Sequence, residues 1–300
     1  GSVALAAEEA DVVYYGDAGA EAVLGNLKYS DVSRSIWSQN AIYEVGALGI
    51  LKGASYGRFG RTVPLTKEEG IALVYRAAGR EAEAQQLGIA INNARPVADR
   101  KTNSQEVLYD GFLQLAMNDG LISARDLADA LNTDQATLTD ENFMRKSSAQ
   151  RQEIAYWLAR VLNIQPVSQQ QELLNYTDWR SVDPDKLAYV EALLREGIIN
   201  GSSGRINPRQ PVTREQAAQI VKNAESFVLD AIGHLKNSAI IESIIPTQDY
   251  TGGSAISGKK ITVTNANGSS ASILTSTHAN ASGAKNENTG TALAGSKSEL

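Results

Sequence analysis

The sequence predicts a mainly α-helical fold built from three helix-loop-helix repeats. The stretch from Gly197 to Ala224 runs from a helix-ending glycine, through a Gly- and Ser-rich loop and a proline, into a new helix. The same order occurs between Gly49 and Thr66. The glycine lies 17 residues before the helix-starting threonine in the first copy (66 minus 49) and 16 before it in the last (213 minus 197). A spacing conserved in this way within one chain indicates tandem structural repeats.

The first repeat, residues 29–92, contains two predicted helices. The first is amphipathic and ends at Gly49, as expected for a C-terminal glycine. The second begins after Pro64, where Thr66 and Glu69 form the Thr-x-x-Glu pattern of a capping box. The apolar positions of the first helix are Ala41, Ile42, Val45 and Leu48.

The second repeat, residues 93–167, diverges from the first. Its first helix is expected to end at Gly120, and its second helix follows near Gln150. The distance from Gly120 to Gln150 is 30 positions (150 minus 120), and we expect an inserted helix in this longer loop, around Ala124 to Leu131. Because glutamine is a poor N-cap, we expect the second helix to begin a turn earlier, at Ser147 or the serine after it.

The third repeat, residues 168–233, follows the order of the first. After Pro211, the residues from Thr213 to Gln216 again form a capping box. The second helices of all three repeats share one apolar face, which predicts one buried side on each. Its positions are Ile71, Leu73 and Val74; Ala155, Trp157 and Leu158; and Ala218, Ile220 and Val221.

Two segments lie outside the repeats. Residues 1–28 mix Ala, Glu and Gly, and we expect a short helix there with a turn near Gly16. Residues 234–300 are rich in Ser, Thr, Gly, Asn and Ala, with a strand-like run from Lys260 to Thr264 and an Asn-Gly turn signal before residues 271–274. This segment is predicted to be a linker or a short β-rich region.

Composition excludes several classes of function. The net charge of -6 argues against bulk binding of nucleic acid or anionic membranes, which requires a basic surface, and leaves local basic pockets possible. The chain has no cysteine, so disulfides, cysteine metal sites and thiol nucleophiles are excluded. No apolar run reaches the roughly 18 residues that a membrane span needs.

No motif for catalysis or cofactor binding is present. The two histidines, His234 and His278, lie outside the repeats and lack metal-ligand spacing. Glu68 and Glu69 are adjacent on a helix, about 100° apart around its axis, so they cannot flank one glycosidic bond. Phosphate-loop, nucleophile-elbow and HExxH patterns are absent. We therefore expect no enzymatic activity, no cofactor and no metal.

The repeats carry residues that resemble the S-layer homology (SLH) domain, a bacterial module for cell-surface anchoring. In the first repeat these are YSDV, Trp37, LGILKG and LTKEE, and in the third they are GIING, an Asn-Pro pair and VTRE. In the second repeat only Arg151 and Glu153 preserve the signature, which leaves its binding site in doubt. The resemblance covers roughly residues 29–230, as three tandem SLH domains.

The resemblance implies a fold, a ligand and a location. One helix per repeat would build a central three-helix bundle of pseudo-threefold symmetry, with ligand grooves between neighbouring repeats. The implied ligand is a secondary cell wall polysaccharide bearing pyruvylated N-acetylmannosamine. The protein would be secreted and held non-covalently at the cell wall, with neighbouring S-layer subunits as further partners.

Three cations occupy the first turn of the second helices: Lys67, Arg151 and Arg214. The helix dipole disfavours a cation there by roughly 0.3 to 1 kcal/mol, so its recurrence suggests a use. Free helix amides together with a basic side chain suit the carboxylate of a pyruvyl ketal. We predict this ligand role. In the alternative, the cations pair with carboxylates such as Glu68, Glu153 or Glu215.

Two aspartates and a tryptophan are also candidates for the ligand site. Asp31 and Asp178 are expected to cap the first helix or to bond a loop amide, with a sugar hydroxyl as the less favoured partner. Trp37 has the flat face needed to stack on a sugar. An aromatic residue at the start of an amphipathic helix is more often core, so we expect it to pack.

Loop residues complete the predicted site. Gly53 and Gly201 are expected to be turn glycines whose missing side chain lets the backbone approach a ligand. Arg58 and Arg205 occupy the same loop in two repeats. We give equal weight to two roles for them: lining the ligand groove, or lying solvated at the surface. The helix-starting residues Thr66 and Thr213 belong to the same set.

The function predicted from these residues is non-catalytic anchoring of a surface protein to the bacterial cell wall. Two other classes remain open. The chain is alternatively the wall anchor of an exoenzyme whose catalytic domain lies beyond Leu300, or a helical scaffold that contacts neighbouring lattice proteins. Binding to purified protein partners but not to polysaccharide would favour the scaffold.

Overall fold

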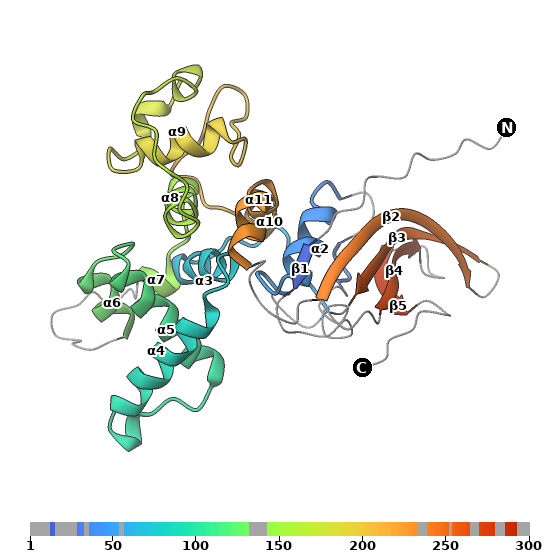
Figure 1. The fold of residues 1–300 in the computed structure, drawn as a ribbon, viewed down its shortest axis with the longest axis horizontal. Helices are drawn as coiled ribbons and strands as arrows, with labels where there is room; N and C mark the ends of the chain where they lie inside the picture. Colours follow the sequence, from blue (N-terminus) through green and yellow to red (C-terminus); the bar gives the residue numbers. More distant parts are fainter. Residues whose placement is uncertain are drawn as a thin grey trace. The chain divides into compact units, whose positions relative to one another are not determined.

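The computed structural model describes residues 13–15, 29–32, 36–53, 57–131, 143–232, 239–251, 254–264, 270–279 and 286–292 (Figure 1). These residues form a mainly helical fold that divides into two compact units. Unit 1 draws its residues from Gly1–Thr62, Arg214–Lys222 and Ile232–Leu300, and unit 2 from Val63–Thr213 and Asn223–Ala231.

The regular secondary structure of unit 2 consists of helices, joined by loops that carry isolated backbone bridges. Short 3-10 turns, η1 (Val97–Asp99), η2 (Leu173–Asn175) and η3 (Trp179–Ser181), lie between its longer helices. The helix predicted around residues 124–131 is present as α6. The helices are α3 (Lys67–Ala77), α4 (Glu81–Ala94), α5 (Ser104–Asn118), α6 (Ala124–Leu131), α7 (Phe143–Lys146), α8 (Arg151–Val161), α9 (Leu187–Arg195) and, except for its last residue, α11 (Glu225–Ile232).

Glycines end the first helix of each predicted repeat, as the sequence indicated. Gly49, Gly120 and Gly197 have φ angles of 71°, 76° and 68°. In this left-handed conformation the next N–H groups turn back onto the helix, as where Ile198 donates to the Leu193 carbonyl at 2.9 Å. A residue with a Cβ adopts this conformation only under strain, which explains the recurrence of glycine.

The starts of α3 and α8 show one confirmed and one wrong prediction. Thr66 caps α3 in a full capping box, in which its hydroxyl accepts from the Glu69 N–H at 3.2 Å. Helix α8 begins at Arg151 with Gln150 as its N-cap, not a turn earlier. Residues 148–150 cannot join the helix because they lie between two backbone bridges, Ser148 to Thr66 and Gln150 to Pro211.

The segments that lead into α3, α8 and α10 (Arg214–Asn223) meet within unit 2. Leu65 donates its backbone N–H to the Val212 carbonyl at 2.9 Å, Val212 donates to Ala149 at 3.1 Å, and Ala149 donates to Leu65 at 2.9 Å. These three bonds form a closed ring, and all three residues are fully buried. Each residue directly precedes the N-cap position of its helix, so equivalent positions of the predicted repeats occupy the ring.

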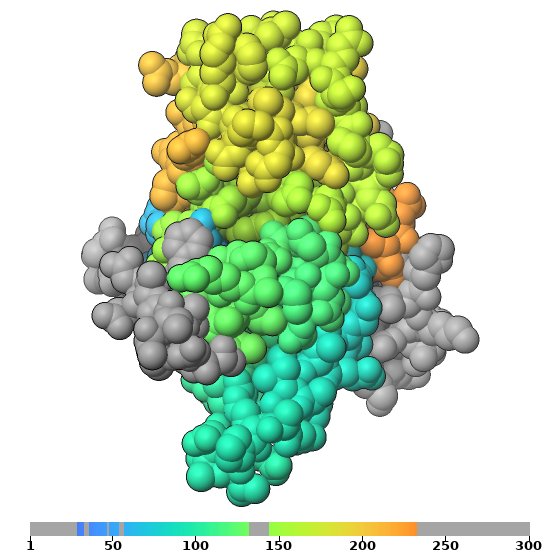
Figure 2. All heavy atoms as spheres, turned by 90° about the vertical axis from the view of Figure 1, so that its left-hand side faces the viewer, coloured from blue at the N-terminus to red at the C-terminus, as the bar shows by residue number. Residues whose placement is uncertain are grey.

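Helices α4 and α5 form an antiparallel hairpin that extends from the rest of unit 2 (Figures 1 and 2). Gly88 and Gly111 lie where the two backbones cross. A Cβ on Gly111 would overlap the carbonyl oxygen of Ala84, and a Cβ on Gly88 would overlap that of Val107. The hairpin therefore packs backbone against backbone, a distance that only glycine permits at these two positions.

Unit 1 combines α2 (Gln39–Ala47), most of α10 and an antiparallel sheet of strand order β1-β2-β3-β4-β5. The strand-like runs in the C-terminal segment lie in β3 and β4. In the N-terminal segment, Val13–Tyr15 form β1, where Val13 pairs with Ile241 of β2; the short helix expected within residues 1–28 is not at these positions, and the rest of that segment lies outside the described residues. The strands are β1 (Val13–Tyr15), β2 (Ala239–Thr251), β3 (Ser254–Thr264), β4 (Ser270–Ala279) and β5 (Asn286–Ala292).

The apolar face predicted for α3, α8 and α10 is confirmed. All nine positions are buried, and the most exposed of them, Ile220, shows 5% of its surface. The remaining eight are Ile71, Leu73, Val74, Ala155, Trp157, Leu158, Ala218 and Val221.

Candidate functional site

Asp31 holds a loop of unit 1 through backbone amides. Its Oδ1 accepts the N–H of Phe59 and its Oδ2 accepts the N–H of Gly60, both at 2.8 Å. Burial raises the pKa of this carboxyl, but these amides and that of Arg61 outweigh the burial and lower the pKa below its usual value. Asp31 is therefore an ionised loop anchor at neutral pH, one of the two roles expected for it.

Asp178 does the same for a loop of unit 2. Its Oδ1 accepts the N–H of Ile206 at 2.9 Å and its Oδ2 accepts the N–H of Asn207 at 2.8 Å. Asp178 gives no side-chain cap to η3. We call residues 52–60, without the undescribed 54–56, the first loop, and residues 200–207 the second loop; both are anchored by an aspartate at the start of their repeat.

Arginines hold these two loops from the other side. Arg214 donates from Nε to the Phe59 carbonyl at 2.8 Å and from Nη2 to the Lys52 carbonyl, and its guanidinium lies 5.2 Å from the centre of the Phe59 ring. Arg151 donates from Nε to Ile206 at 3.0 Å and from Nη2 to Asn200 at 3.1 Å. The contacts correspond atom for atom, and each guanidinium fork bridges the two ends of its loop.

Lys67, the third cation of the set, has a different partner. Its Nζ lies 2.5 Å from Oε1 of Glu153 on α8, and the residue is only 3% exposed. The carboxylate pairing left open by the sequence is therefore present for Lys67. The described partners of Arg151 and Arg214 are backbone carbonyl groups of the two loops and not side-chain carboxylates.

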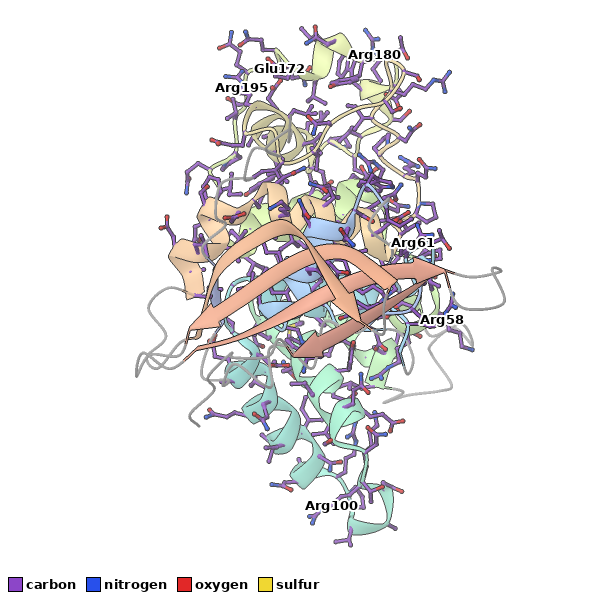
Figure 3. All side chains as sticks on the ribbon, turned by 90° about the vertical axis from the view of Figure 1, so that its right-hand side faces the viewer. Arg58, Arg61, Arg100, Glu172, Arg180 and Arg195 are labelled. Carbon is purple, nitrogen blue, oxygen red and sulfur yellow. The ribbon has the colours of Figure 1, made fainter. Side chains whose placement is uncertain are left out.

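Each loop displays one exposed arginine, Arg58 in the first and Arg205 in the second. Among the described residues, neither side chain has a hydrogen-bond or ion-pair partner. Figure 3 shows Arg58 on the same side of unit 1 as Arg61, whose guanidinium bonds the Asp31 carbonyl at 2.8 Å. A loop that is already held in one conformation loses little further conformational entropy on binding. An unpaired arginine on such a loop can therefore bind an anionic group at a small entropic cost.

Gly53 and Gly201 are needed for the folding of the loops themselves. A Cβ on Gly53 would lie 2.6 Å from the Arg58 carbonyl oxygen, and one on Gly201 would overlap the ring of Tyr176. The direction in which a side chain would point is thus filled by the protein at both positions, and the expected approach of a ligand to this backbone stays a prediction. Tyr176 and its counterpart Tyr29, two residues before each anchoring aspartate, were missed as site residues although their matching position was visible in the sequence.

Trp37 is 61% exposed, so the expectation that it packs in the core is wrong. Trp37 precedes α2. The next residue, Ser38, is the one that is buried there, and its hydroxyl donates to Glu215 at 2.9 Å. Arg61 also pairs with Glu215, at 3.1 Å. Thr213 directly precedes α10 and bridges to Pro64.

A charged cluster lies beside α3 in unit 2, around the fully buried Asp110. Arg95 and Lys101 each contact its carboxylate at 3.0 Å, and Arg145 pairs with both Asp110 and, at 3.4 Å, Glu68. Burial is the largest influence on Glu68 and raises its pKa to about 6, despite the nearby Arg145. The fold therefore disfavours the ionised form of Glu68.

Replacing Glu68 by glutamine is expected to stabilise the protein at pH 8 by about 1 to 2 kcal/mol and to leave its stability unchanged at pH 4.5. A folded pKa near 6, above the unfolded value of 4.5, means that ionisation opposes folding as the pH rises through 6. Urea unfolding at the two pH values measures this. The exposed Glu106→Gln in the first turn of α5 is the control, and equal gains in both variants would contradict the assignment.

A pocket of about 690 Å³ lies at the C-terminal ends of α3, α5 and α8, beside α11. It contains none of the predicted ligand residues. Its charged lining includes Arg80, which pairs with Asp119 at 2.9 Å.

Within the described part of the chain, no cluster of His, Asp or Glu is suited to a metal ion, and no helix combines the length and apolar character of a bilayer span.

These features define a helical module with anchored, arginine-bearing loops. Residues 175–218 match the S-layer homology domain. The matched segment contains Asp178, the second loop and Arg214, and S-layer homology domains generally take part in anchoring surface proteins to the cell wall. The match indicates a protein of the cell surface or cell wall. Comparison with curated proteins gave no match.

Proposed function

We propose that the chain contains three S-layer homology repeats in a pseudo-threefold arrangement, of which residues 175–218 are the part that matches the family. The ring formed by Leu65, Ala149 and Val212 supports this arrangement. Three equivalent residues that donate in turn, each to the next, are what a local threefold axis would produce. The corresponding contacts of Arg214 and Arg151 give independent support.

The module anchors a surface protein non-covalently by binding a pyruvylated secondary cell wall polysaccharide. The observation that carries this proposal is the pair of anchored loops, each with an exposed arginine that has no described partner. A pyruvyl ketal adds one fixed carboxylate to an otherwise uncharged sugar, and a guanidinium can bind it with two parallel hydrogen bonds. Arg58 and Arg205 are the residues we assign to this contact, with Arg214 and Arg151 positioning the loops.

Sedimentation with purified cell walls tests the proposal. The chain should co-sediment with sacculi that retain their secondary polysaccharide and remain in solution with sacculi stripped of it. Equal binding to stripped sacculi would assign recognition to peptidoglycan and contradict the proposal. Removal of the pyruvyl groups alone should release most of the bound protein, because the arginine contact depends on the carboxylate.

The double variant Arg58→Ala/Arg205→Ala should lower affinity for the intact polymer at least tenfold without loss of stability. Both side chains are exposed, so their removal breaks no described contact of the fold. Arg100→Ala removes one charge from the tip of the α4–α5 hairpin and is the net-charge control for each single variant, Arg58→Ala and Arg205→Ala (Figure 3). A comparable loss in Arg100→Ala would show that binding depends on overall charge instead of the loops.

A further inference from the structure

We infer that the module has two ligand sites rather than three, because the helix-start cation at the third equivalent position, Lys67, is held by Glu153, whereas Arg214 and Arg151 clamp arginine-bearing loops at the other two. This inference rests on the proposed function. It concerns how many sites the module offers, one in unit 1 at the first loop and one in unit 2 at the second loop.

The order of contacts among the repeats identifies this third position. The helix-start cation of the third repeat, Arg214, holds the loop of the first, and that of the second repeat, Arg151, holds the loop of the third. If this order continues around the three repeats, the helix-start cation of the first repeat, Lys67, should hold a loop of the second repeat. The backbone bridges follow the same cycle, since Thr66 of the first repeat pairs with Ser148 of the second.

At this third position the helix-start cation contacts a carboxylate, whereas at the other two positions it contacts backbone carbonyl groups. Lys67 contacts Glu153 at 2.5 Å, and its side chain is 4% exposed. Glu153 is itself fixed, because its Oε1 also accepts the Gln150 N–H at 2.9 Å as part of the start of α8. With its helix-start cation held in a largely buried ion pair, this position lacks the guanidinium clamp that positions the loops of Arg58 and Arg205 at the other two.

Charged residues near this third position are also paired. Glu68, next to Lys67 on α3, faces Arg145 of α7, and Arg145 in turn pairs with Asp110 of α5. Lys101 and Arg95 both have Asp110 as partner. Arg145, Lys101 and Arg95 are thus in ion pairs with protein carboxylates, unlike Arg58 and Arg205, which have no described partner.

Counting bound ligands tests the inference. The probe is a soluble disaccharide with a pyruvyl ketal, and its unpyruvylated counterpart is the control; the readouts are titration calorimetry and native mass spectrometry of the full chain. Two molecules should bind the wild type, and one should bind each of Arg58→Ala and Arg205→Ala. Any other number for the wild type overturns the inference, and no binding of the pyruvylated probe refutes the proposed function as well.

Variants at the third position make the test specific. Lys67→Met keeps the unbranched aliphatic part of the side chain without its charge, and Lys67→Met/Glu153→Gln removes both charges together, so that no carboxylate is left buried without its partner. Both should still bind two molecules, with affinity changed less than twofold. A thermal melt confirms folding, and loss of one bound molecule in the folded double variant would show that Lys67 serves one of the ligand sites, which overturns the inference.

Discussion

Replacing Gly111 by alanine is expected to destabilise unit 2 by about 3 kcal/mol, the largest effect on folding that we predict for a single methyl group. The new Cβ would overlap the Ala84 carbonyl oxygen and lie 2.8 Å from the Gly88 nitrogen. All these atoms belong to helix backbone, so α4 and α5 would have to separate along the hairpin. Alanine favours helix over glycine by up to about 1 kcal/mol, which does not offset that separation.

Gly70→Ala is the matched control for this prediction. Gly70 is also buried within a helix, but the nearest atom to its Cβ would be Cδ1 of Ile154, at 2.7 Å. The end of a flexible side chain can rotate away, so this variant should lose less than about 1 kcal/mol. Urea unfolding of both variants measures the difference. Equal stability of Gly111→Ala and wild type would mean that the two helices do not cross at these glycines.

Replacing Arg214 by alanine is expected to loosen the first loop and to cost roughly 3 kcal/mol of local stability. The side chain is 4% exposed and donates to two backbone carbonyls, which would lose a charged donor in a buried setting. Lysine should not rescue it, because a single ammonium cannot reproduce the guanidinium fork that spans Lys52 and Phe59. Faster hydrogen exchange at the amides of Phe59 and Gly60, which Asp31 holds, provides the readout.

Two comparisons separate a structural role of Arg214 from a direct ligand contact. Arg58→Ala removes an exposed guanidinium from the same loop and should leave the exchange rates unchanged while weakening polymer binding. Arg151→Ala should loosen the second loop by a smaller amount, since Arg151 is less buried than Arg214. If Arg214→Ala abolished binding with unchanged exchange in the loop, the arginine would contact the ligand itself.

Much of the fold could be predicted because its signals are local. A glycine that must adopt positive φ, a threonine followed three residues later by glutamate, and an apolar face of helical period each depend on residues within a turn or two. Gly197 and Thr66 behave as predicted for this reason. The start of α8 was mispredicted because the competing contacts of Ser148 and Gln150 come from distant segments.

The candidate site was predicted less well, for a related reason. Bonding a loop amide was one of the two roles expected for Asp31, and the amides that it bonds lie 28 and 29 residues away, so the sequence did not identify them. The partners of Arg214 lie 155 and 162 residues away, and no local pattern points to them. The burial of Trp37 was wrongly expected because helical periodicity does not say where the buried face begins at a helix end.

The sequence by itself determined the repeated order of helix, glycine, loop and capped helix, and the residue types placed at each helix start. These follow from backbone sterics and capping, which act over a few residues. Only the tertiary structure decided what each helix-start cation does, because a charge takes its role from the groups that fold against it. Arg214 and Arg151 met backbone carbonyls and became loop clamps, Lys67 met Glu153 and became half of an ion pair, and the exposed Arg58 and Arg205 have no described partner.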